Sequence, residues 1–222
     1  YCQIIDDTYI NQLPGAISLH IITEVADANN YGEERLKMNS GLDKEAIFVL
    51  SKKYHYFEDI NKAAKIRRYI SSRNILQLPE SIRSIIRSKQ QQAESYEKDA
   101  KAHLTAALLD AKMFVAGDNF PKRTNSVKDN IDAALGRLVA NVYTKLNDIT
   151  HNFQSDEELR YIVENENQQL STDGSIAVYN PAAVKDISEF LELKARGMLP
   201  VSMGDIQRKF SGIPYGWKEI DI

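Results

Sequence analysis

Two short apolar stretches near the start of the chain have the length and composition of β-strands. Residues 16–25 (AISLHIITEV) are rich in β-branched residues and follow the pair Pro14–Gly15, which punctuates the chain as a turn. Residues 46–50 (AIFVL) form a second apolar run of strand length. The polar residues between the two runs predict a connection with a short helix around Glu33–Met38. The pattern therefore predicts a small β-sheet.

The hydrophobic period becomes helical in residues 57–70 (FEDINKAAKIRRYI), where apolar positions form an imperfect stripe. Asp59 early and Arg73 late suit the dipole of such a helix. Pro79 then lies where the first turn of a helix tolerates proline. No residue in the range 81–111 breaks a helix, so we expect a second helix about 45 Å long.

A heptad seam runs along this long helix in alternating steps of four and three residues. Its positions are Ile82, Ile86, Lys89, Ala93, Tyr96, Ala100, His103 and Ala107. Since Lys89 and His103 are polar and the alanines are small, the seam favours an antiparallel helix partner in the same chain over a self-standing coiled coil.

A third strand and a further helix are predicted after the long helix. Residues 113–120 (MFVAGDNF) are short, apolar and turn-terminated, which is typical of a strand. Ser126 and Asp129 then have the spacing of a capping box. The helix they begin has the most regular apolar face of the chain, made of Val127, Ile131, Leu135, Leu138, Val142, Leu146 and Ile149. We expect it to be the antiparallel partner of the long helix.

A domain boundary is expected near residue 172, because residues 168–174 are polar and turn-prone. The first domain, residues 1–172, would hold the small sheet and the long helical hairpin. A second capping box within it, Ser155 with Glu158, predicts one more helix.

The remaining residues, 173–222, have the element order of a helix-turn-helix unit. Asn180 supplies an N-cap, with proline at the first helical position, for a helix that ends at Gly197. After a short apolar turn (MLPV), Ser202 and Asp205 cap a second short helix. This order is how a helix-turn-helix or winged-helix unit begins.

The last thirteen residues, FSGIPYGWKEIDI, contain the only tryptophan of the chain in a turn-like stretch. A further helix is expected to start near Trp217, with the rest of that helix and any wing beyond Ile222. We therefore expect the chain to be a piece of a larger protein. The predicted fold class is α+β, mostly helical, with a small sheet, a long antiparallel helical pair and an incomplete helix-turn-helix or winged-helix-like module.

Composition narrows the range of partners. In 222 residues, 43% of them apolar, there is enough material for a core. The net charge of −3, from 28 basic and 31 acidic residues, gives no overall attraction to nucleic acid or anionic lipid. The single cysteine, Cys2, excludes an internal disulfide and favours a reducing, cytoplasmic location. The apolar runs are far short of the roughly 20 residues that cross a bilayer, so no membrane contact is expected.

Motifs for catalysis are absent from the sequence. It has no GxxxxGK[ST] or GxGxxG phosphate loop, no HExxH or CxxC metal spacing and no GxSxG elbow. The four histidines are isolated from one another, and the carboxylates fall on helix starts and polar faces. We therefore expect no catalytic, cofactor-binding or metal-binding residue and no enzyme activity in this chain.

Basic residues gather in two places where phosphate contacts could form. The candidate nucleic-acid contacts are Lys62, Lys65, Arg67, Arg68, Arg73, Arg83, Arg87 and Lys89 on the two consecutive helices, and Arg208 and Lys209 in the C-terminal unit. For the helical pair, the nearby acids Glu58, Asp59 and Glu80 favour a solvated surface. For the C-terminal unit the alternatives stay open, because winged helices also dock proteins.

Three stretches together resemble a known family: KIRRYISSRN, ESIRSIIRSKQQQAESYEKDAKAHLTAALLDAKMFVAGD and DIQRKFSGIPYGWKEIDI. They resemble the region downstream of the nucleotide-binding motor in the BrxC or PglY family, large P-loop ATPases of BREX phage-resistance systems. The resemblance covers residues 45–222. It implies a bacterial defence component with an AAA-type ATPase core, acting with proteins that modify host DNA and block phage replication.

The resemblance carries no catalytic residue onto this chain, because the phosphate-binding loop of the family is missing from it. ATP and Mg²⁺ are expected only upstream, and an oligomeric full-length protein is implied as an option. The expected function is a non-catalytic coupling segment that links the motor to DNA or to partner subunits. The alternative is a pure protein scaffold without DNA contact.

Overall fold

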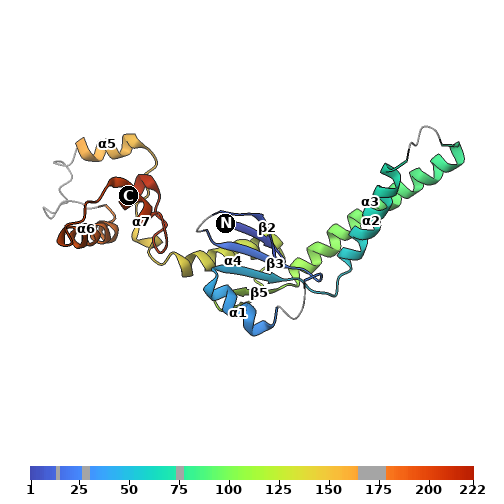
Figure 1. Ribbon diagram of the computed structural model, residues 1–222, viewed down its shortest axis with the longest axis horizontal. Helices are drawn as coiled ribbons and strands as arrows, with labels where there is room; N and C mark the ends of the chain where they lie inside the picture. Colours follow the sequence, from blue (N-terminus) through green and yellow to red (C-terminus); the bar gives the residue numbers. More distant parts are fainter. Residues whose placement is uncertain (14–15, 27–30, 74–77, 165–178) are drawn as a thin grey trace. The chain divides into compact units, whose positions relative to one another are not determined.

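The computed structural model describes residues 1–13, 16–26, 31–73, 78–164 and 179–222 (Figure 1). The chain divides into two compact units, Tyr1–Leu138 and Val139–Ile222. The boundary expected near residue 172 lies outside the described residues, and the observed division falls earlier. The expected boundary rested on the turn-prone composition of residues 168–174, whereas the two observed units are defined by which residues pack together.

The first unit contains a six-stranded mixed sheet with the order β2-β1-β3-β4-β5-β6. Strands β1, β3 and β4 are parallel to one another, and the remaining neighbours are antiparallel. The strands are β1 (Cys2–Ile5), β2 (Thr8–Asn11), β3 (Ser18–Ile22), β4 (Glu45–Val49), β5 (Lys112–Val115) and β6 (Asp118–Phe120).

Two of the three predicted strands are confirmed as β3 and β4, but the third prediction is wrong in one respect. MFVAGDNF forms two strands rather than one, because Ala116 and Gly117 have φ angles of 54° and 88° and turn the chain back. The backbone N–H of Gly117 donates to Ser40 Oγ at 3.0 Å, which fixes this turn against α1 (Glu33–Leu42). The sequence analysis missed β1 and β2, which are short and carry polar residues.

Both faces of the sheet are buried at its central strands, β3, β4 and β5. On one face, Ile22, Ile47 and Phe114 pack with Leu36 of α1. On the other face, Phe48 is 1% exposed. Side chains alternate between the faces of a strand, so the continuous apolar runs in β3 and β4 are the expected signature of strands covered on both sides.

Helices α2 (Tyr56–Ser71) and α3 (Glu80–Leu109) form the antiparallel hairpin (Figure 1). The seam of α3 is confirmed at every seventh residue, since Ile86, Ala93, Ala100 and Ala107 are buried. The expected partner is wrong: α3 packs on α2, not on α4 (Val127–Val142). The reason is that α2 offers its own seven-residue series, with Tyr56, Ala63 and Ile70 all buried.

His103, a polar residue of the seam, has a hydrogen-bond partner on the other helix of the hairpin. His103 Nδ1 lies 2.9 Å from Asp59 Oδ2, and Asp59 is itself buried. At the base, Tyr56 and Ala107 pack with Leu50, which follows β4. The tyrosine hydroxyl also accepts a hydrogen bond from the backbone N–H of Glu24 at 3.3 Å. These contacts attach the hairpin to the sheet.

The helix predicted after Ser126 begins as expected, with Asp129 N–H donating to Ser126 Oγ at 3.3 Å. It ends at Val142 rather than continuing to Ile149. A short 3₁₀ turn, Leu146–Asp148, takes its place.

The second unit contains α5 (Asp156–Glu164), α6 (Pro181–Arg196) and α7 (Met203–Phe210). Its apolar core joins Ala183 of α6, Phe210 of α7 and Trp217. The capping box of α7 is confirmed, with both Ser202 and Asp205 contributing. The helix expected near Trp217 appears as a 3₁₀ turn, Glu219–Asp221.

Asn180 precedes α6 but does not cap it through its side chain. Its Oδ1 instead accepts from the backbone N–H groups of Thr150 and His151 at 2.9 and 2.7 Å, and its Nδ2 donates to His151 O at 2.9 Å. The predicted N-cap position is therefore confirmed, with proline in the first turn, but the side chain of Asn180 binds a distant loop instead of the first turn of α6.

Candidate interaction surface on the helical hairpin

Several of the candidate DNA-binding cations on the hairpin face carboxylates. Arg67 donates from Nε and Nη2 to both oxygens of Glu97, at 2.9 and 3.0 Å. This side-chain hydrogen bond raises the pKa of Arg67 and lowers the pKa of Glu97. Lys62 Nζ lies 3.5 Å from Glu58 Oε2 and 3.8 Å from Asp59 Oδ1. Local acids therefore offset the positive charge along the middle of the hairpin.

Glu80 offsets positive charge in the same way near the start of α3. Its carboxylate lies 2.8 Å from Arg83 Nη2 and 3.5 Å from Arg87 Nη1. Four of the eight hairpin candidates are thus in ion pairs. Within the part of the chain that the structure describes, the other four form none: Lys65, Arg68, Arg73 and Lys89.

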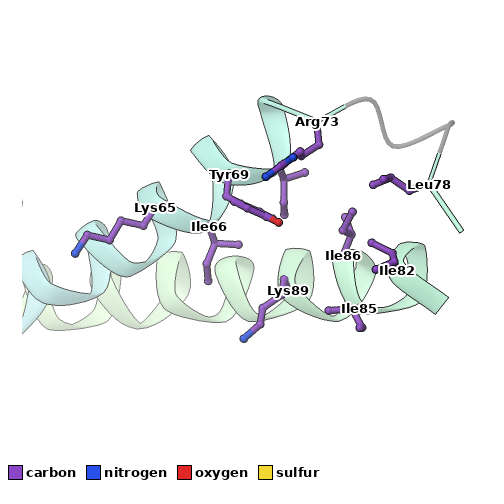
Figure 2. A pocket seen from close by; sticks show the side chains of 10 residues that line it. Lys65, Ile66, Tyr69, Arg73, Leu78, Ile82, Ile85, Ile86 and Lys89 are labelled. Atoms are coloured by element: carbon purple, nitrogen blue, oxygen red, sulfur yellow. The ribbon is translucent and has the colours of Figure 1, made fainter. Parts of the chain in front are cut away.

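Three of these four cations line a groove at the end of the hairpin that we call the hairpin groove (Figure 2). The groove has a volume of about 550 Å³. Its cations are Lys65, Arg73 and Lys89, and Tyr69 completes this polar set. The aliphatic lining consists of Ile66, Ile70, Leu78, Ile82, Ile85 and Ile86. No carboxylate is among the described lining residues.

The hairpin groove exists because α3 extends beyond the end of α2. Ile70 and Ile86 are still buried in the helix pair. Ile82 lies one turn closer to the start of α3 and is 43% exposed, and Ile85, which directly precedes Ile86, is 57% exposed. Helix α2 ends at Ser71, so it does not continue alongside the seam residue Ile82. The arrangement leaves apolar surface open beside cations that form no ion pair with the described residues.

Sequence reasoning missed this groove, although one signal for it is present. Ile82 and Ile86 belong to the seam, but Ile85 does not. An isoleucine outside the seam adds apolar surface that the helix pair does not need. The prediction treated the surrounding cations as a charge surface alone.

The cations of the second unit are also partly engaged. Arg208 Nη1 lies 3.4 Å from Asp205 Oδ1, although its side chain is 81% exposed. Lys209 Nζ lies 4.9 Å from the centre of the Phe190 ring, where the cation is attracted to the aromatic face. Both residues belong to the last turn of α7, a place where positive charge also stabilises a helix.

A polar cleft lies on the sheet of the first unit, around His20. His20 Nδ1 lies 3.0 Å from Glu45 Oε2, and Tyr31 donates to Asp7 Oδ1 at 2.6 Å. Burial, followed by the hydrogen bond to Asp7, raises the pKa of Tyr31 far above its usual value. These groups satisfy one another, and the described residues contain no group of three or more histidines, cysteines or carboxylates placed to hold a metal ion.

The fold and these surfaces define a two-unit protein in which a six-stranded mixed sheet carries a helical hairpin and a separate helix-turn-helix unit follows. Residues 1–138 match the family described as BREX ATP-binding protein BrxC 4th domain with six-stranded beta sheet. Residues 145–222 match BREX ATP-binding protein BrxC winged helix-turn-helix domain. The chain belongs to the BrxC family of BREX ATP-binding proteins.

The family matches confirm the resemblance noted in the sequence and the mixed, mostly helical fold class. The gap between them, residues 139–144, falls at the start of the second compact unit. No solved structure matches the chain. Among the described residues, no helix is both long enough and apolar enough to span a membrane.

Proposed function

We propose that this chain is a non-catalytic segment that couples the ATP-binding part of a BREX protein to other BREX proteins in the cytoplasm. ATP and Mg²⁺ would be held by another region of the whole protein, since this sequence contains no phosphate loop. The α2–α3 hairpin would provide the contact with the partner protein.

The hairpin groove is the observation that carries this proposal. An open apolar surface on a folded domain is typical of a site that another protein covers. The pairing of Lys62, Arg67, Arg83 and Arg87 with carboxylates weighs against the hairpin as an extended phosphate-binding face.

The test is to shorten the hairpin within the whole BREX ATP-binding protein. Residues 62–100 are replaced by a short Gly-Ser loop, which leaves the base contact between Asp59 and His103 in place. We expect co-purification with other BREX proteins and protection against phage to be lost, while ATP hydrolysis is retained. Unchanged co-purification would show that the hairpin is not the contact surface.

DNA contact through the second unit is the second candidate, supported by its match to a winged helix-turn-helix family and by exposed Arg208 on α7. Double-stranded DNA is titrated at several salt concentrations, because phosphate contacts make affinity fall steeply with salt. Charge reversal of Arg208 and Lys209 should weaken binding. Reversal of Arg68 and Arg73 tests the hairpin in the same assay. Absence of binding by the unaltered protein would favour the pure scaffold.

A further inference from the structure

We propose that the hairpin groove binds an acidic amphipathic helix of a partner protein. The inference rests on the proposed function and deepens it, because it names the chemistry of the partner. Two observations carry it: the shape of the apolar surface and the sign of the charge around that surface.

The charge at this end of the hairpin is strongly positive. Residues 65–89 contain seven lysines and arginines and one glutamate, Glu80. The whole chain is by contrast slightly acidic, with a net charge of −3. Glu80 is already shared between Arg83 and Arg87, and the cations lining the groove form no ion pair with the described residues, so they are open to a carboxylate of a partner. Charge complementarity of this kind selects an acidic partner.

The surface between these cations is aliphatic, which favours a protein over a nucleic acid as the ligand. Ile82 and Ile85 are exposed and can gain free energy only by being covered with apolar groups. A nucleic-acid backbone offers phosphates but no aliphatic side chains. Bases would need aromatic platforms, and the one aromatic residue of the groove, Tyr69, already has Arg73 over its ring at 5.1 Å.

The length of the groove suits a helix. The described part of α3 that lines it runs from Ile82 to Lys89, and at 1.5 Å per residue this corresponds to about 12 Å. A ligand helix of about three turns would cover it with one apolar stripe, leaving its acidic residues beside Lys65, Arg73 and Lys89. Helix-in-groove recognition uses apolar anchors at such spacings.

The test uses the complete 222-residue chain and two synthetic helical peptides. One peptide carries leucines on one face and glutamates on the other, and the second has lysine in place of every glutamate. Binding is measured by fluorescence anisotropy of a dye on the peptide. We expect the acidic peptide to bind about tenfold or more tightly than the lysine peptide.

Two isoleucines of the hairpin give a matched pair of variants. Ile82 lines the groove and is 43% exposed, whereas Ile60 lies outside it and is 44% exposed. Ile82→Glu should weaken binding of the acidic peptide by about tenfold, because apolar contact is lost and the new carboxylate repels the glutamates of the peptide. Ile60→Glu should leave the affinity unchanged. Circular dichroism of both variants checks that the helices are intact.

Several results would overturn the inference. They are equal binding of the two peptides, equal effects of the two variants, and no binding of the acidic peptide at millimolar concentration. Displacement of the peptide by single-stranded DNA would assign the groove to nucleic acid, and self-association lost in Ile82→Glu would assign it to a second copy.

Experiments in the whole protein can distinguish a failure of the groove as the binding site from a failure of the hairpin as the contact surface. Ile82→Glu in the whole protein could leave co-purification intact while the shortened hairpin abolishes it. The hairpin would then remain the contact surface, but the groove would not be the binding site.

Discussion

The rings of Phe210 and Trp217 stack with their centres 5.1 Å apart and their planes 7° from parallel. Trp217 is 3% exposed, and its indole Nε1 donates to the backbone carbonyl of Lys145 at 2.8 Å. One side chain therefore ties the end of the chain both to α7 and to the segment after α4. This explains why the single tryptophan follows a turn-like PYG stretch.

Replacement of Trp217 should therefore unfold the second unit more readily. Trp217→Ala should lower the free energy of unfolding by about 3–5 kcal/mol, because it leaves a large cavity in the core. Trp217→Phe keeps an aromatic ring but leaves the Lys145 carbonyl without its donor, at a cost of about 1–3 kcal/mol. Urea denaturation followed by circular dichroism measures both. Equal stability of all three proteins would contradict the core role assigned to this ring.

Gly216 is required by both backbone conformation and space. Its φ angle is +69°, and an added Cβ would lie 2.7 Å from Cδ1 of Tyr143. Gly216→Ala should therefore destabilise the second unit by more than about 2 kcal/mol, from the left-handed conformation and the close contact together. Urea denaturation followed by Trp217 fluorescence reports on this unit, since no other tryptophan is present.

The matched control is Gly204, which lies in α7. A Cβ there would meet only Ser202 Oγ, at 3.8 Å. Gly204→Ala should be neutral or slightly stabilising, because alanine is the better helix former. If the two substitutions had the same effect, the requirement for glycine at 216 would be disproved.

The hairpin seam is expected to reject large side chains. Ala100 is 5% exposed and packs between the two helices, so Ala100→Leu should cost about 1–3 kcal/mol of stability through overpacking. Ala102 lies on the exposed side of the same helix, and Ala102→Leu should change stability little. Thermal unfolding followed by circular dichroism compares the two. Equal tolerance at both positions would mean that the helices do not pack closely at Ala100.

The stability of the first unit should depend on pH through His20. Burial alone lowers the pKa of His20, but the hydrogen bond and charge of Glu45, together with the carbonyl of Asp6, raise it, and the net direction is upward. A raised pKa in the folded state means that the folded protein binds the proton more tightly. The stabilisation is therefore complete below the unfolded pKa of about 6.5 and is lost as pH rises through the folded value.

Glu45→Gln removes the negative charge that holds this proton. The variant should show a lower pKa of His20 in an NMR titration and a weaker loss of stability above about pH 6.5. A His20 titration that does not move in the variant would rule out Glu45 as the cause.

The sequence predicts features that depend on residues close in the chain better than features that depend on a neighbouring helix or a distant loop. The capping box of Ser202 and Asp205 was predictable, because both partners lie within one helical turn. The buried series Ile86, Ala93 and Ala100 was likewise predictable from its period alone. The groove beside Ile82 was not, because the exposure of this seam residue depends on where the neighbouring helix α2 ends.

By itself, the sequence determined the helical and strand periods, the helix caps and the absence of a phosphate loop, since these depend on neighbouring residues or on residue identity. The tertiary structure decided that α3 pairs with α2, that Asn180 binds the loop at Thr150 and His151, and that an apolar groove stays open among cations. Each of these outcomes is a competition between surfaces or hydrogen-bonding groups far apart in the chain. Such a competition is settled only when the whole unit packs.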